Sequence, residues 1–126
     1  MNEHQENLLD HYSAPRNYGV PTFKANARAK LQNLSCGDEI EVFLKISKGK
    51  IKDVAFTGEG CSIAIGTASQ LLEDVKGKEI TKIISLNDSY PEELIGLFLT
   101  PSRRKCALLS FETIKEAINQ YNKAIA

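Results

Sequence analysis

The chain has 126 residues, of which 42% are hydrophobic, and its 16 basic side chains balance 16 acidic ones. A chain of this length can fill a core without covalent cross-links, so we expect a single domain over residues 1–126. Zero formal net charge gives no general attraction to phosphate backbones or anionic membrane surfaces. Composition therefore argues against nucleic acid as a partner.

The sequence offers no segment for crossing or entering a membrane. No apolar stretch approaches the roughly 20 residues needed to span a bilayer. The first residues, MNEHQENLLDHY, lack the basic start and apolar run of a secretion signal. We therefore expect a cytoplasmic protein, whose three cysteines stay reduced and form no disulfide framework.

Hydrophobic periodicity predicts strands in the first half of the chain. A short helix is expected over residues 3–12, followed by an irregular segment rich in proline and glycine. Apolar and polar side chains then alternate, which is typical of strands, over 23–32, 40–46 and 51–56. The turns between these segments are short, so the strands should form an antiparallel meander.

The second half of the chain has helical spacing. We expect a helix with an apolar stripe over 64–75, a short helix over 80–84, another over 89–98, and a long helix from about 102 nearly to the end. Ser89 and Glu92 resemble a capping box, and Phe98 and Ile125 are placed on apolar stripes. Strands followed by helices predict an α+β fold, an antiparallel three-stranded sheet with helices packed on one face.

The three cysteines all lie at the ends of predicted elements. Cys36 lies in the first strand turn, Cys61 at a strand-to-helix junction after two glycines, and Cys106 in the first turns of the last helix. Cys106 is about 100° away from the stripe that begins at Ala107, so we expect it at the edge of the packed face. One free cysteine can be a small buried hydrophobe, but three at element ends favour a shared site.

Asp38 adds an oxygen ligand to the three sulfurs. It is separated from Cys36 by Gly37, whose tolerance of positive φ lets the turn direct a thiolate and a carboxylate to one point. The alternative is an aspartate that bonds its own turn backbone. With Cys61 and Cys106 the pair completes a tetrahedral set suited to zinc or iron, although spacings of 25 and 45 residues are not those of a zinc finger.

A basic cluster, Arg103, Arg104 and Lys105, precedes the third cysteine at the start of a helix. The helix dipole disfavours cations there, so we expect the cluster to face an anionic partner such as a thiolate-rich metal site. It would then hold the thiol pKa down. The alternative is a solvated cluster without such a partner. The two histidines, His4 and His11, are expected on the exposed side of the first helix.

Four segments of the sequence resemble the U-type iron-sulfur cluster scaffold family, which comprises IscU, SufU and the N-terminal domain of NifU. They are HYSAPRNYG, SCGDEI, FTGEGCSIAIGTAS and RRKCALLSFETI, and the resemblance runs from about residue 7 to residue 121. It implies a three-stranded antiparallel sheet covered by helices. It also implies a non-enzymatic role, in which the protein accepts sulfur as persulfide from a cysteine desulfurase, assembles a [2Fe-2S] cluster with iron and electrons, and passes it to apo iron-sulfur proteins.

The resemblance also implies ligands. They are Cys36, Asp38, Cys61 and Cys106, which would bind zinc in the isolated protein and iron or a [2Fe-2S] cluster transiently. Lys105 replaces the histidine that IscU members carry at this position, and together with Arg103 it follows the SufU pattern, whereas the inserted segment of SufU is missing. The chain reads LFLTPSRRKC where IscU has its proline-rich chaperone-recognition motif, which speaks against docking to a dedicated Hsp70 system.

Sulfur acceptance assigns different roles to the cysteines. An acceptor thiolate must leave its metal and reach a partner's active site, so it should lie on a mobile turn or an exposed helix start. Cys36 and Cys106 meet this condition, with Arg103 assisting, while Cys61 is expected to be a fixed ligand. Asp38, the ligand least matched to a soft centre, would make the contents exchangeable. The alternative function is a zinc-stabilised interaction module without sulfur turnover.

Overall fold

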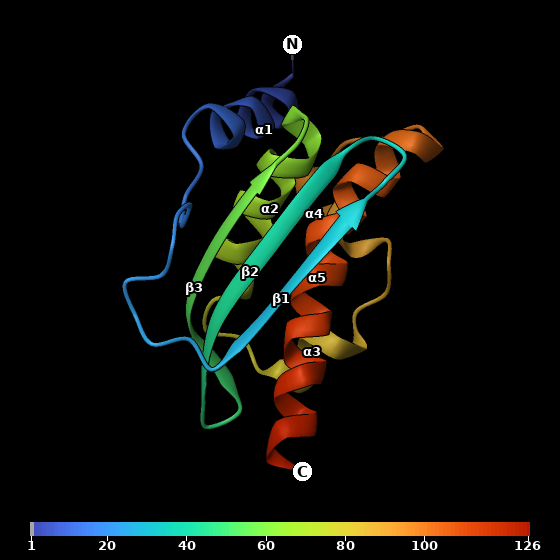
Figure 1. Ribbon diagram of the computed structural model, residues 1–126. Coiled ribbons are helices and arrows are strands. Elements are labelled where there is room, and N and C mark those ends of the chain that lie inside the picture. The colour runs from blue at the N-terminus through green and yellow to red at the C-terminus, as the bar shows by residue number, and fades with distance from the viewer. Residues whose placement is uncertain (1) are drawn as a thin grey trace.

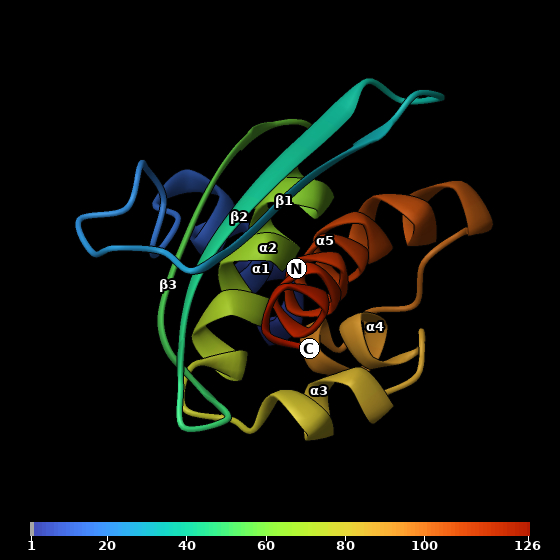
Figure 2. The same ribbon diagram turned by 60° about the horizontal axis from the view of Figure 1, so that its bottom comes forward.

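The computed structural model describes residues 2–126, which form a three-stranded sheet with the helices on one face (Figures 1 and 2). Its elements are α1 (Glu3–Ser13), β1 (Ala27–Asn33), β2 (Asp38–Ser47), β3 (Lys50–Glu59), α2 (Ser62–Val75), α3 (Ile80–Ser85), α4 (Tyr90–Ile95) and α5 (Pro101–Ile125). None of the helices within 2–126 is long and apolar enough to cross a membrane. The α+β prediction is confirmed.

The sheet is an antiparallel meander with β2 in the centre. Alternate residues of β2, among them Ile40, Val42 and Leu44, are fully buried against the helices. The opposite face of the sheet carries ion pairs that join neighbouring strands, such as Lys30 with Glu39 at 3.0 Å. One face therefore supplies the core, and the other is mainly polar, with Arg28 lying over the ring of Phe43.

Strand β1 is shorter than expected, because it begins at Ala27 and not at residue 23. The side-chain amide of Asn26 donates to the carbonyl of Ile46 and accepts from its N–H, both at 2.8 Å. A bulge between Lys45 and Ile46 also breaks the register of β2 with β3. The side chain of Asn26 thus forms hydrogen bonds with backbone groups of β2 that a longer β1–β2 ladder would use.

The main core lies between the sheet and helices α2 and α5. Phe56 of β3 is fully buried here, together with Phe111, Ile114 and Ile118 of α5, which follow the predicted stripe. Ile125 was expected on the same stripe but is exposed, because the last turn of α5 projects past the sheet (Figure 1).

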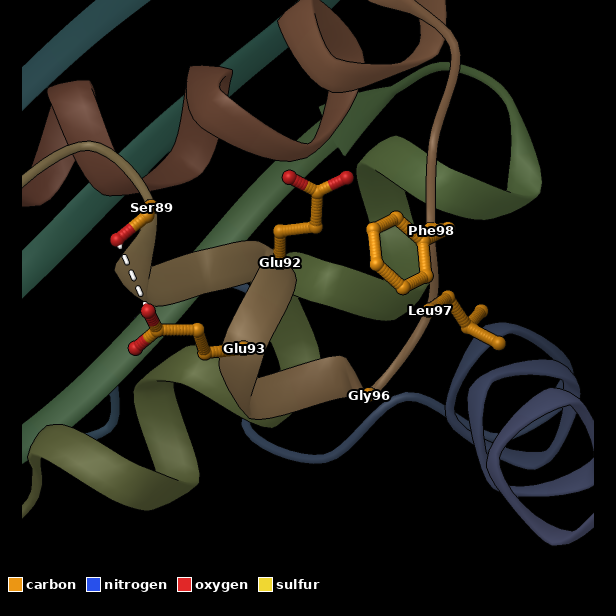
Figure 3. A pocket seen from close by; sticks show the side chains of 6 residues that line it. All are labelled: Ser89, Glu92, Glu93, Gly96, Leu97 and Phe98. Atoms are coloured by element: carbon orange, nitrogen blue, oxygen red, sulfur yellow. Dashed lines mark hydrogen bonds between the residues drawn. The ribbon is translucent and has the colours of Figure 1, made fainter.

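Helix α4 begins directly after Ser89, as predicted, but it ends earlier than expected. It stops at Ile95 because Gly96 adopts a left-handed conformation with φ of +70°, a common helix C-cap. Phe98 is therefore not part of a helix and is fully exposed beyond its end (Figure 3). The expected capping box does not form, since the Ser89 hydroxyl contacts Asn87 and Glu93 and not the helix backbone.

Helix α1 packs closely on α2. A Cβ atom on Gly66 of α2 would lie 2.7 Å from the side chain of Leu8 and 2.9 Å from its carbonyl oxygen. One turn further, Nδ1 of His11 lies 2.7 Å from the Ser69 hydroxyl. His11 is therefore half-buried between the two helices, whereas the sequence prediction placed it on the exposed side.

We predict that Gly66→Ala destabilises the protein. In a free helix this change is worth about 1 kcal/mol of stabilisation, but overpacking typically costs about 1–3 kcal/mol. The Leu8 carbonyl is backbone and cannot rotate away, so we expect the free energy of unfolding to fall by roughly 1 kcal/mol. Urea denaturation measures it, and a more stable variant would show that α1 is loosely packed.

Candidate metal centre

The loop between β1 and β2 places Cys36 over Asp38. The backbone N–H groups of Cys36 and Gly37 both donate to the carbonyl of Asn33, at 3.3 and 2.8 Å. Gly37 has φ of +75°, the left-handed conformation that the sequence suggested. The Cys36 thiol is thereby turned back to donate to Oδ2 of Asp38 at 3.0 Å.

Two glycines let the end of β3 approach this carboxylate. A Cβ atom on Gly60 would lie 2.6 Å from Oδ1 of Asp38, and one on Gly58 would lie 2.3 Å from the Glu39 carbonyl oxygen. Oδ1 of Asp38 accepts from the N–H of Cys61 at 3.2 Å. Asp38 is only 3% exposed, and the backbone group that its carboxylate binds is 23 residues away and not in its own turn.

Cys106 is more buried than expected. It is 7% exposed and belongs to a small apolar cluster, separate from the main core, whose other members are Leu8, Ile63, Ala64, Ile95 and Ala107. Residues of α1, α2 and α4 complete this cluster around α5, which the periodicity of a single helix cannot reveal. Leu8 in particular had no sequence signal that would connect it with the cysteines.

Three ligand atoms already lie together. The Cys36 and Cys106 sulfurs and a carboxylate oxygen of Asp38 are all within 4.8 Å of one another, and the two sulfurs are 3.7 Å apart. Zn–S bonds of about 2.3 Å in a tetrahedron require a sulfur–sulfur distance of about 3.8 Å. The sulfur–oxygen distance of 3.0 Å would have to open by about 0.5 Å. These three residues therefore fit a tetrahedral zinc or iron site with a small adjustment.

Cys61 lies outside the group of three atoms but lines the same cavity of about 410 Å³. It is the N-cap of α2, its side chain makes no capping hydrogen bond, and it is exposed. The sequence had assigned exposure to Cys106 and a fixed position to Cys61. The exposure expected for Cys106 is wrong, because Cys106 is buried, whereas Cys36 and Cys61 are both exposed.

The basic cluster divides between two environments. Arg103 lines the cavity with the cysteines, as expected. Arg104 points elsewhere and forms an ion pair with Glu92, with Nε 3.0 Å from Oε1. Within residues 2–126, neither Arg103 nor Lys105 forms an ion pair. The cluster as a whole therefore does not face the sulfurs.

Without a metal, the Cys106 thiol is held in its neutral form. Burial raises its pKa far above the usual range, and hydrogen bonds with Asp38 and Cys36 add to the rise. The predicted lowering of the thiol pKa by the nearby cations therefore does not hold for Cys106 in the metal-free chain. A bound metal cation would favour its thiolate.

A family model described as the NifU-like N terminal domain matches residues 3–126. The chain belongs to this family.

Named relatives agree with that assignment, and a solved structure has the same fold. The NifU-like domain is 39% identical to the iron-sulfur cluster assembly scaffold protein IscU of Aquifex aeolicus, over 94% of this chain and 76% of the relative. It is 30% identical to the zinc-dependent sulfurtransferase SufU of Bacillus subtilis, over 88% and 86%. A putative SUF-system scaffold of Fervidobacterium islandicum has the same fold, with a TM-score of 0.78 over 94% and 96% of the chains at 23% identity.

We predict unequal thiol reactivity in the metal-free NifU-like domain. Cys36 and Cys61 should react with iodoacetamide at least about tenfold faster than Cys106, whose burial limits both access and thiolate formation. Timed labelling followed by peptide mass spectrometry gives the three rates. In urea the rates should converge, and equal rates in the folded protein would contradict the buried position of Cys106.

Proposed function

We propose that this chain is an iron-sulfur cluster assembly scaffold that accepts sulfur and holds a transient cluster. The proposal rests on one observation above all, the meeting of Cys36, Asp38 and Cys106 within 4.8 Å. The names of the IscU and SufU relatives support the same function. Its partners would be a cysteine desulfurase, which supplies sulfur, and apo iron-sulfur proteins, which receive the product.

Cys36 is the best placed first acceptor of sulfur. It is exposed on a hairpin loop, whereas Cys106 is buried. Its thiolate would attack the outer sulfur of the desulfurase persulfide, forming a new S–S bond while the desulfurase thiolate leaves, with no net oxidation or reduction. Arg103, on the wall of the same cavity, would favour the attacking thiolate.

The four sequence-predicted ligands, Cys36, Asp38, Cys61 and Cys106, would hold the metal. Cys61 completes the set once its exposed side chain turns into the cavity. Zinc, when bound, would keep the thiols ionised and hold the hairpin against α5. Iron and the [2Fe-2S] cluster are cargo, and the reduction of each transferred sulfur to sulfide needs two electrons from an external donor.

We predict that a cysteine desulfurase with free cysteine adds sulfur to the protein, detected as a gain of about 32 Da by intact mass spectrometry. Cys36→Ser should abolish most of the first adduct, because it removes the exposed acceptor. Cys61→Ser is the matched control, since it removes the other exposed thiol. A zinc-loaded protein that gains no mass, and whose thiols all resist alkylation, would instead be a structural zinc module.

We predict that Asp38→Ala prolongs the life of a reconstituted [2Fe-2S] cluster by roughly tenfold and slows its transfer to an apo-ferredoxin. The carboxylate is the ligand least suited to a soft centre, so its removal leaves the sulfur ligands in place. Visible absorbance follows both rates.

Asp38→Asn separates this role from a structural one. The amide oxygen can still accept from the Cys61 N–H but is a poorer ligand than a carboxylate. A ligand role predicts that the asparagine variant also releases its cluster slowly. If the cluster lifetime and the transfer rate of both variants equal those of wild type, Asp38 is not a ligand.

A further inference from the structure

Helix α5 carries Cys106 but has no side-chain cap at its start. Its N-cap residue, Thr100, makes no capping hydrogen bond to the helix backbone, and Pro101 occupies the first position. Proline fixes its own φ but leaves the orientation of the first turn to other contacts. That orientation matters, because Cys106 follows within two turns.

Glu92 of α4 contacts the start of α5 in another way. Its Oε2 accepts from the backbone N–H of Leu99 at 2.8 Å, and its Oε1 accepts from Nε of Arg104 at 3.0 Å. The Arg104 guanidinium in turn donates to the carbonyl of Leu99 at 3.2 Å. One carboxylate therefore binds both the loop before α5 and its first turn.

Glu92 has different contacts from Glu93, its neighbour on the same helix. Its side chain is 18% exposed and extends toward α5, whereas Glu93 turns to Ser89 and bonds its hydroxyl at 3.0 Å (Figure 3). The contacts of Arg104 and Leu99 also hold the pKa of the Glu92 carboxyl below its usual range. Glu92 is therefore an ionised anchor, and Glu93 is a local surface contact.

The anchor acts on both groups that α5 presents to the cavity. Arg103 directly precedes Arg104, and Cys106 follows it by two residues, so all three move with the first turns of the helix. The Cys106 sulfur is 3.7 Å from the Cys36 sulfur, and a small rotation of the helix would change that distance. A metal site tolerates deviations of only a few tenths of an ångström in its metal–ligand distances.

We propose that Glu92 is a positioning residue for the metal centre: through Leu99 and Arg104 it sets the place of Cys106 opposite Cys36. The inference rests on the proposed function for the metal itself. It also explains why Arg104 is not available to the sulfurs, since Glu92 holds it on the far side of α5. The competing explanation is that the apolar cluster around Cys106 fixes the helix without help.

Zinc affinity tests the proposal. Competition with a chromophoric chelator is measured for wild type, Glu92→Gln, Arg104→Gln, their double variant and the matched control Glu93→Gln. We expect the first two variants to bind zinc roughly tenfold more weakly, and the double variant to be no weaker than either. Glu93→Gln should stay within about twofold of wild type.

Folding is checked separately, by thermal melting of each metal-free variant. The folded state should persist at the temperature of the titration, so that weaker binding reflects a displaced ligand and not unfolded chain. If Glu92→Gln does not fold, the zinc affinity of Arg104→Gln alone tests the proposal. Zinc affinity within about twofold of wild type in the folded variants, or an equal loss in Glu93→Gln, would overturn the proposal.

A second measurement needs no metal. In a background of Cys36→Ser and Cys61→Ser, the alkylation rate of Cys106 reports its position directly, and Glu92→Gln should raise that rate about tenfold. If the wild-type protein binds no zinc, the proposed metal site is wrong, but the alkylation rate of Cys106 still tests the role of Glu92. An unchanged labelling rate in that case would overturn the positioning role.

Discussion

The contact between the Asp38 carboxylate and the turn at Gly60 is the constraint on which the site depends. A buried carboxylate is unfavourable unless hydrogen bonds replace its water. Asp38 is satisfied by the N–H of Cys61 on one oxygen and by the Cys36 thiol on the other. Because Gly60 has no Cβ, β3 can come close enough for this. The same contact therefore joins the β1–β2 loop to the junction of β3 and α2, and it places the candidate ligands Cys36, Asp38 and Cys61.

The packing around the site is asymmetric, and this asymmetry suits a scaffold. Cys106 belongs to an apolar cluster formed by α1, α2, α4 and α5, so its position is held by the fold. Cys36 and Cys61 lie on a loop and at a helix start, where solvent and partners have access. In the proposed function, one anchored sulfur and two accessible ones would allow a bound metal or cluster to be held on one side and exchanged from the other.

The fold also places the basic side chains near the site in different environments. The chain has no net charge, and the run from Arg103 to Lys105 would by itself disfavour the start of a helix. Glu92 neutralises Arg104 on the side away from the cavity, so a carboxylate lies near the positive end of the helix dipole. Arg103 remains on the cavity wall beside the three cysteines.

Sequence alone determined the α+β class and the antiparallel meander, because alternation and turn glycines are local properties. It also predicted the three cysteines and Asp38 as one ligand set from the order of the motifs. It misplaced the start of β1 and the end of α4, which Asn26 and Gly96 decide through tertiary hydrogen bonds and backbone conformation. Only the tertiary structure decided that Cys106 is buried, that Cys61 is exposed and that Arg104 binds Glu92. Burial and ion pairing depend on which helices cover α5, and no periodicity within α5 contains that information.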